Sequence, residues 1–296
     1  MKLNWRDEDL VMYLEVEKGI KIYYEDHGNP DAFTLLLLHG WGVSSALWSE
    51  QIPFLVENGF RVITMDARGH GRSDDGKYTK DLNLLEVIYD DIQALISHLK
   101  VKSPYGIIGH SAGGGIAMSI YLSNPEDVAF LCILNSSYTL YESIDERIFW
   151  SLIPNLINLG LHPIFSGPYR YIVRKAIPII AIVLNKPQEK VKIWVEDILN
   201  VRKKVLLEEL KHIRKYNLKD KLDKIYIPCL IIAGEYDWLT PPYKSKILHK
   251  YIPNSELHII KKTGHLSKVE KSEEVNKLIL NFIKRVQNNE FKSQNA

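Results

Sequence analysis

The sequence lacks the features that mark a disulfide-stabilised, membrane-spanning or nucleic-acid-binding protein. Only two of its 296 residues are cysteines. Cys132 and Cys229 stand inside apolar runs and form no CxxC pair, so we expect buried free thiols in a reducing compartment. The longest apolar run in the interior, 177–184, contains a proline and is far shorter than the roughly 20 residues that cross a bilayer. Lys and Arg exceed Asp and Glu by only two, so the overall charge does not predict a nucleic-acid partner.

The amino-terminal segment also lacks the pattern of a secretory signal. Five of the first ten residues are charged and no apolar stretch follows them, so we expect a cytoplasmic protein. The composition is that of a globular chain, 46% hydrophobic and 25% charged. Its length fits one large domain or two small ones.

Two kinds of pattern predict the strands of a sheet. Residues 13–17 and 20–24 alternate with period two around Lys18-Gly19, which predicts a β-hairpin. Continuous apolar runs are typical of strands buried on both faces of a parallel sheet. Six further strands are predicted from largely apolar segments: 34–38, 61–65, 105–108, 128–134, 227–232 and 256–260. The sequence therefore predicts eight strands.

Helical periodicity separates these strands. Apolar residues recur at i, i+3 and i+4 spacing over 84–96 and again over about 273–286, as on the buried face of an amphipathic helix. Strands that alternate with helices indicate an α/β fold, in which right-handed crossovers build a mostly parallel sheet flanked by helices.

One segment, 138–222, interrupts this alternation. It has no convincing strand and shows helical patterns, such as the one over 191–210. We predict a helical cap inserted after the sixth strand, while 1–137 and 223–296 form the core. The segment carries 15 Lys and Arg against nine Asp and Glu. Two interpretations of this surplus stay open: a solvated helical surface, or a surface that contacts an anionic partner.

The strongest chemical motif is Gly109-His110-Ser111-Ala112-Gly113, which directly follows a predicted buried strand and precedes a helical run. This is a G-x-S-x-G pattern in the strand–turn–helix context that exposes a serine hydroxyl. The flanking glycines are needed where a Cβ would collide in so sharp a turn. The start of the helix offers free N–H groups to developing negative charge. We predict that Ser111 is a nucleophile.

A second motif, His39-Gly40-Trp41-Gly42, follows an earlier buried strand. Acyl transfer requires two backbone N–H groups that point at the nascent oxyanion. We predict that the N–H groups of Trp41 and Ala112 form this oxyanion hole.

The sequence resembles the α/β-hydrolase fold superfamily, in its esterase- and lipase-like branch. A third segment, 66–73, resembles the D-x-R-G-x-G-x-S turn of that branch, which implies structural roles for Asp66 and Arg68. The resemblance covers about 10–137 and 223–287, and the segment between them matches only in position, as a cap or lid.

The resemblance implies that the nucleophile, the acid and the histidine follow one another along the chain. Asp237 and His265 match the positions of the acid and the base. His265 is expected to take the serine proton and Asp237 to fix its tautomer. Glu235 is the competing carboxylate, and 135–137, Asn-Ser-Ser, offers no acid after the sixth strand.

The other histidines have plainer interpretations. His110 is expected to pack or hydrogen-bond inside the serine turn, and His39 to stabilise the oxyanion loop. The remaining histidines show no metal-ligand spacing, and the glycine run 109–115 lacks the ending of a P-loop. We therefore expect no metal, no nucleotide and no other cofactor.

The cap is rich in apolar residues, among them Ile148, Phe149, Trp150, Leu152, Ile153, Leu156, Ile157, Leu159, Leu161, Ile164, Phe165 and the run 177–184. Most are expected to be buried against each other and the core, and some to line a cavity above Ser111. These residues favour a small-molecule ester with a small to medium hydrophobic acyl group, hydrolysed through an acyl-enzyme. Alternatives on the same triad are a C–C bond hydrolase or enol-lactonase, a perhydrolase or haloperoxidase-like activity, and a slow-turnover, receptor-like binding protein. A serine nucleophile argues against epoxide hydrolases and haloalkane dehalogenases, because the resemblance implies that those relatives have an aspartate in the position of this serine.

Overall fold

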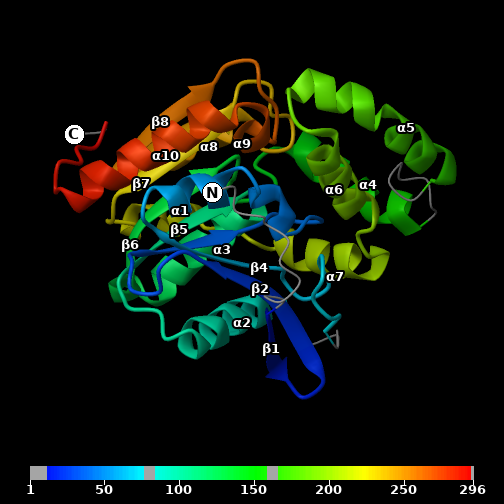
Figure 1. Ribbon diagram of the computed structural model, residues 1–296. Helices are drawn as coiled ribbons and strands as arrows, with labels where there is room; N and C mark the ends of the chain where they lie inside the picture. Colours follow the sequence, from blue (N-terminus) through cyan, green and yellow to red (C-terminus); the bar gives the residue numbers. More distant parts are fainter. Residues whose placement is uncertain (1–11, 77–83, 159–165, 295–296) are drawn as a thin grey trace.

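The computed structural model describes residues 12–76, 84–158 and 166–294, which form a central sheet between layers of helices (Figure 1). The strands are β1 (Met12–Glu17), β2 (Ile20–His27), β3 (Thr34–Leu38), β4 (Arg61–Met65), β5 (Tyr105–His110), β6 (Val128–Leu134), β7 (Cys229–Gly234) and β8 (Ser255–Ile260). Their order in the sheet is β1-β2-β4-β3-β5-β6-β7-β8. Strand β2 pairs antiparallel with both β1 and β4, and the other neighbouring strands among the described residues pair in parallel. This confirms the predicted hairpin and the mostly parallel eight-stranded sheet.

The helices are α1 (Gln51–Glu57), α2 (Leu84–His98), α3 (Ala112–Ser123), α4 (Ile144–Asn158), α5 (Gly167–Leu184), α6 (Gln188–Leu199), α7 (Lys203–Ile213), α8 (Pro242–Tyr251), α9 (Ser267–Glu270) and α10 (Ser272–Gln287). Helices α2, α3 and α8 cover one face of the sheet, and α1 and α10 cover the other. Among the described residues, no helix is both long and apolar enough to cross a bilayer.

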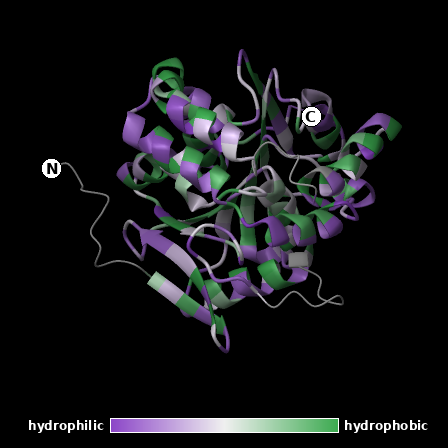
Figure 2. Cartoon of the chain, turned by 90° about the vertical axis from the view of Figure 1, so that its right-hand side faces the viewer, coloured by the Kyte–Doolittle hydropathy of each residue, from purple (hydrophilic) through white to green (hydrophobic). Residues whose placement is uncertain are grey.

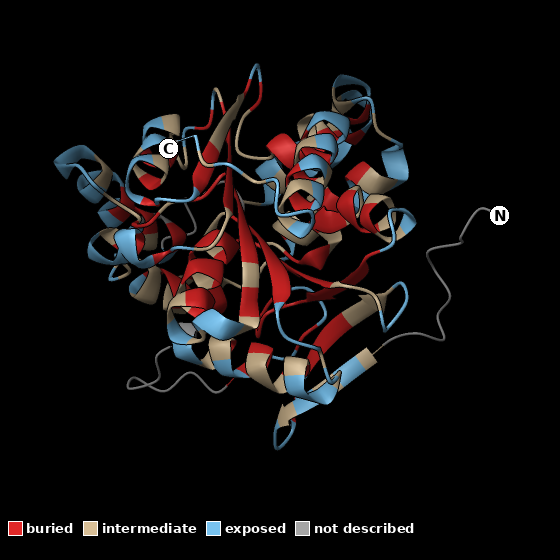
Figure 3. Ribbon diagram, turned by 90° about the vertical axis from the view of Figure 1, so that its left-hand side faces the viewer, coloured by how far each residue is buried: buried red, intermediate tan, exposed pale blue. Residues whose placement is uncertain are grey.

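Strands β3, β4, β5 and β7 are buried along their whole length, in the interior that Figure 3 colours red, whereas β1 alternates between half-buried and exposed residues. In β3, Leu36 and Leu38 pack into the cluster under α2 and α3, whereas Leu35 and Leu37 pack into the cluster under α1 and α10. A continuous apolar run is therefore the pattern that this strand requires. The two cysteines are buried and free, and they lie in opposite clusters.

Four helices, α4–α7, stand between β6 and β7 in the chain and lie together at one side of the sheet (Figure 1). We call them the inserted helices. The helical pattern over 191–210 is divided between two helices, α6 and α7. The chain is extended at Arg202, whose guanidinium reaches the core, where it donates to Ser73 O (2.8 Å) and pairs with Asp75. The cap boundaries at 138 and 222 stay predictions.

Candidate active site

Ser111 occupies the sharp turn between β5 and α3. Its φ of 55° and ψ of −121° lie in a region that a non-glycine residue rarely adopts, so the turn is strained. The neighbouring glycines make the turn possible. A Cβ at Gly109 would lie 2.4 Å from Gly113 O, and one at Gly113 would lie 2.3 Å from Leu38 O. Larger residues at either position would push the turn apart.

The loop after β3 packs directly against this turn. A Cβ at Gly40 would lie 2.9 Å from Ser111 Cβ, so the close approach needs glycine. Trp41, which follows, lines the same cavity as Ser111 and Ala112. In the described part of the chain, the backbone N–H groups of Trp41 and Ala112 donate to no other residue. Both groups are therefore available to a bound oxygen.

Asp237 and His265 form a hydrogen-bonded pair after β7 and β8. The Nδ1–H group of His265 donates to Asp237 Oδ2 at 2.9 Å. Asp237 Oδ1 accepts from the backbone N–H groups of Leu239 (3.0 Å) and Thr240 (2.9 Å). Burial alone would raise the pKa of Asp237, but the hydrogen bonds from His265 and Thr240 outweigh it and hold the pKa below its ordinary value. The aspartate is therefore ionised at neutral pH.

This bond fixes the tautomer of His265, because a proton on Nδ1 leaves a lone pair on Nε2. His265 and Ser111 line the same cavity. Although both residues are described, no hydrogen bond joins Ser111 Oγ to the ring in this conformation. In structures without substrate, such bonds are often long and shorten only when substrate is bound.

Two side chains that the sequence did not single out hold the pair in place. Asn135, directly after β6, donates to Asp237 Oδ2 (2.9 Å) and to Gly264 O (3.1 Å). The Oγ1–H group of Thr240 donates to Asp237 Oδ2 at 2.6 Å. In the sequence, position 135 stands out only because it offers no carboxylate after the sixth strand. A polar residue at the end of a fully buried strand was the signal that could have revealed it.

The remaining histidines of the motifs have structural contacts. His110 Nε2–H donates to the backbone oxygen of His265 (2.9 Å), and burial holds the pKa of His110 well below its ordinary value. His39 Nδ1–H donates to Gly40 O (2.8 Å), while its Nε2 accepts from Ala67 N–H (2.9 Å). Burial lowers the pKa of His39 to about 4. Both rings are therefore neutral, and their hydrogen bonds stabilise the loops that carry Ser111 and Trp41.

Three other charged residues from the motifs lie away from His265. Glu235 accepts from Lys262 N–H (2.9 Å) and faces the surface. Asp66 is buried and accepts hydrogen bonds from Ser45 and Arg72. Arg68 holds Asp91 through two bonds of 2.6 and 2.8 Å. These contacts brace loops and leave Asp237 as the carboxylate beside the imidazole.

The cavity above Ser111 has a volume of about 420 Å³ and is mainly apolar. Its roof includes Trp150 and Ile157 of α4 and Leu206 and Leu210 of α7. Lys244 also lines it, but its ammonium donates to Leu140 O (2.7 Å) and pairs with Glu146 (3.1 Å). This lysine is thus already neutralised by the protein.

The expectation that most apolar cap residues are buried is wrong for several of them. Ile148, Phe149 and Leu152 of α4 are exposed, as are Ile179, Ile182 and Val183 of α5. Leu159, Leu161, Ile164 and Phe165 lie outside the described residues, and so does the side chain of Leu156. The cavity therefore uses only part of the apolar surface of the inserted helices.

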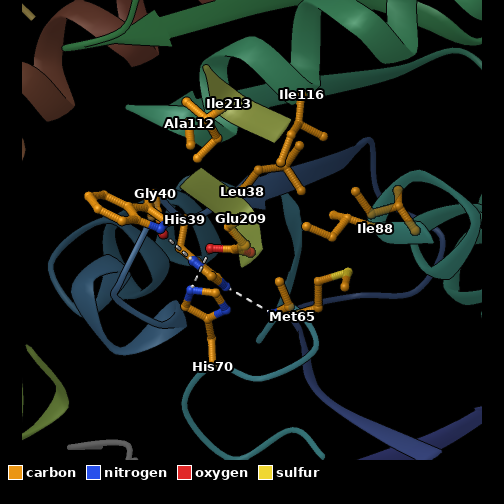
Figure 4. A pocket seen from close by; sticks show the side chains of 13 residues that line it. Leu38, His39, Gly40, Met65, His70, Ile88, Ala112, Ile116, Glu209 and Ile213 are labelled. Atoms are coloured by element: carbon orange, nitrogen blue, oxygen red, sulfur yellow. Dashed lines mark hydrogen bonds and ion pairs between the residues drawn. The ribbon is translucent and has the colours of Figure 1, made fainter. Parts of the chain in front are cut away.

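A second cavity, of about 30 Å³, lies beside the first and shares Trp41 and Ala112 with it (Figure 4). A buried pair closes one side of it: Glu209 Oε2 of α7 lies 3.2 Å from His70 Nε2. The same ring nitrogen lies 3.2 Å from the backbone nitrogen of Gly42. The inserted helices thus contact the loop that carries Trp41 through one imidazole.

Comparisons with known proteins agree with this fold. A family model described as serine aminopeptidase, S33, matches residues 29–272. An uncharacterized hydrolase of Bacillus subtilis (strain 168) is 30% identical over 278 residues, which are 90% of this chain and 95% of that protein. A bifunctional esterase/perhydrolase of Acinetobacter calcoaceticus is 26% identical over 92% of this chain and 99% of its own length.

An esterase from Exiguobacterium antarcticum shares the fold, with a TM-score of 0.77 at 21% identity over 93% of this chain and 99% of that one. The eight-stranded sheet, the family model and these relatives give one conclusion. The chain is a hydrolase of the α/β-hydrolase superfamily and belongs to the serine aminopeptidase S33 family.

Proposed function

We propose that the chain is a serine hydrolase that cleaves carboxylic esters of small to medium hydrophobic acids. The observation that carries this proposal is the 2.9 Å bond between His265 and Asp237 at the wall of the cavity that Ser111 also lines. A hydroxyl, an oriented imidazole and a buried carboxylate are the parts of an activated serine nucleophile.

In the proposed reaction, Ser111 Oγ attacks the ester carbonyl carbon while its proton passes to His265 Nε2. Asp237 stabilises the imidazolium, and the N–H groups of Trp41 and Ala112 donate to the oxyanion. The bond to the alcohol breaks and His265 returns the proton to the leaving oxygen. Water, deprotonated by His265, then attacks the acyl-serine carbonyl carbon; the bond to Ser111 Oγ breaks, His265 returns the proton to Ser111 Oγ, and the acid is released. No cofactor enters these steps.

The cavity supports a neutral, apolar acyl group as substrate. Its lining is mainly apolar, and the cation that lines it, Lys244, is paired with Glu146. A charged acyl chain would lose its hydration there without gaining a partner. We further propose that residues 138–222 form the cap over this cavity. The buried free cysteines favour a reducing compartment, so we place the reaction in the cytoplasm.

Turnover of p-nitrophenyl esters of graded acyl length by wild type and Ser111→Ala tests the proposal. We expect Ser111→Ala to lose at least about a thousandfold in kcat/KM. The matched control is Ser119→Ala, since Ser119 lines the same cavity but bonds to Gly115 O (3.1 Å) and Tyr216, both outside the proposed triad. Full activity in Ser111→Ala would overturn the assignment. Faster turnover of an enol-lactone or a dienoate than of any ester would replace the proposed substrate class and keep the nucleophile.

A further inference from the structure

Helix α5 packs against the molecule with one face and leaves the opposite face uncovered. Ile177 and Ala181 are buried in a cluster with Val191 and Trp194 of α6. On the far side, Ile179, Ile182 and Val183 are 65%, 79% and 77% exposed. The exposed apolar residues of α5 recur with helical spacing on one face, which we call the α5 stripe: Tyr171, Ile172, Ile179, Ile182 and Val183.

The α5 stripe is not explained by the catalytic cavity. None of the described residues of α5 lines that cavity, whose roof comes from α4 and α7. Figure 2 turns the side with the inserted helices toward the viewer and colours hydrophobic residues along its helices green, and the apolar residues of the α5 stripe are exposed. Apolar side chains exposed this far and aligned along one helix mark a contact surface.

The charge on α5 indicates what that surface contacts. The helix contains Arg170, Arg174 and Lys175 and no acidic residue. Arg174 is directed to α6, where it pairs with Glu196 (2.7 Å). Lys175 lies within the stripe, with its ammonium 5.7 Å from the centre of the Tyr171 ring. The uncovered face therefore combines apolar side chains with a cation and has no anion of its own.

We propose that the α5 stripe docks on the surface of an anionic lipid bilayer. Its apolar side chains would enter the boundary between headgroups and acyl chains, and Lys175 would reach the lipid phosphates. A second copy of the chain fits less well. A two-fold interface places the same patch against itself, so each Lys175 would be buried against the apolar stripe of the other copy with no carboxylate from α5 to pair with it.

Flotation with lipid vesicles tests this inference, which does not rest on the proposed function. We expect the wild type to float with phosphatidylcholine vesicles that contain about one third phosphatidylglycerol, and at least about tenfold less with pure phosphatidylcholine. Raising the salt concentration should weaken the binding. The double variant Ile179→Glu/Ile182→Glu should lose it. The matched control is Ile144→Glu, which changes an isoleucine on α4 that is 76% exposed and should bind as the wild type does.

Circular dichroism and turnover of a soluble ester check that each variant is folded, since α5 contributes no residue to the cavity. Failure of the wild type to float with anionic vesicles would overturn the proposal. Equal flotation of the double variant would also overturn it. The proposal would also be overturned if light scattering showed that the wild type is a dimer and the double variant a monomer, and no vesicle binding were observed.

Discussion

At the scale of single residues, Asp237 is held as an anion by donors from three segments of the chain. His265, the backbone after β7 and Asn135 all contact its carboxylate. The resemblance to the α/β-hydrolase fold implies Asp237 itself from the sequence. It cannot predict Asn135, because the contact joins residues 102 positions apart and depends on how β6 and β7 end side by side.

The role of Asp237 is open to a matched pair of variants. Asp237→Asn removes the charge that stabilises the imidazolium of His265 and favours the wrong tautomer, so we expect kcat to fall by about 10³–10⁴. Glu235→Gln removes a carboxylate that contacts Lys261, Lys262 and Tyr236 and should leave kcat unchanged. Ester turnover at neutral pH measures both. A larger loss of kcat in Glu235→Gln than in Asp237→Asn would show that Asp237 is not the acid.

A second buried charge has no part in the proposed reaction. Lys268 of α9 is fully buried, with its ammonium 4.2 Å from the centre of the Trp48 ring and bonded to Leu47 O. Burial lowers the pKa of Lys268 to about 7, far below the value of about 10.4 in an unfolded chain. The unfolded state therefore binds this proton more tightly, and the cost to stability grows as the pH falls from about 10 to 7.

Lys268→Met should therefore raise the melting temperature, and by more at pH 7 than at pH 10. The expected gain at pH 7 is on the order of several kcal/mol, because one pKa unit corresponds to about 1.4 kcal/mol. Thermal unfolding at the two pH values measures it, with the partly exposed Lys271→Met as the control. A gain that is equal at both pH values would contradict a titrating Lys268.

At the scale of elements, α7 contacts the loop that carries Trp41 through His70. Gly42 N–H donates to His70 Nε2, and Glu209 faces the same nitrogen. The nitrogen cannot accept from Gly42 and donate to Glu209 at once. Burial lowers the pKa of His70, but Glu209, the Arg68 carbonyl and Asp66 outweigh it, so the pKa is raised. When His70 is protonated, its Nε2–H group donates to Glu209 and no longer accepts from the N–H group of Gly42, the residue after Trp41.

Glu209→Gln should move the acid limb of the kcat/KM profile to lower pH. Without the carboxylate the pKa of His70 falls, so its neutral form, which holds Gly42, persists further into acid. His39 and Asp197 also interact electrostatically with the His70 ring, and both residues are unchanged in the variant. The control is Glu208→Gln, which removes the partner of Lys211 on the same helix. Identical profiles in all three proteins would exclude this link.

Elements differ in how far the sequence predicts them. The apolar run at 34–38 predicts a buried strand, and the glycines of the serine turn predict a sharp turn. Both predictions depend only on residues that are close together in the chain. The division of 191–210 into α6 and α7 was not predicted, because it depends on the contact of Arg202 with the loop at 73–75. The exposed face of α5 was also missed, since its composition is that of a buried helix.

At the scale of the whole molecule, the sheet brings together side chains that are far apart in the chain. Ser111 follows β5, Asp237 follows β7 and His265 follows β8, all at the carboxyl edge of parallel strands. The inserted helices α4 and α7 place an apolar roof above this edge. In the proposed reaction, the core supplies the reacting groups and the inserted helices shape the space for the acyl chain.

The most direct measurement is the site of covalent attachment of a fluorophosphonate, mapped by mass spectrometry of the digested protein. Fluorophosphonates phosphonylate a serine that is activated by a histidine. We expect one adduct, on Ser111, with loss of ester turnover in proportion to labelling and no adduct in His265→Ala. An adduct on another residue, or full turnover after Ser111 is labelled, would contradict the proposed nucleophile.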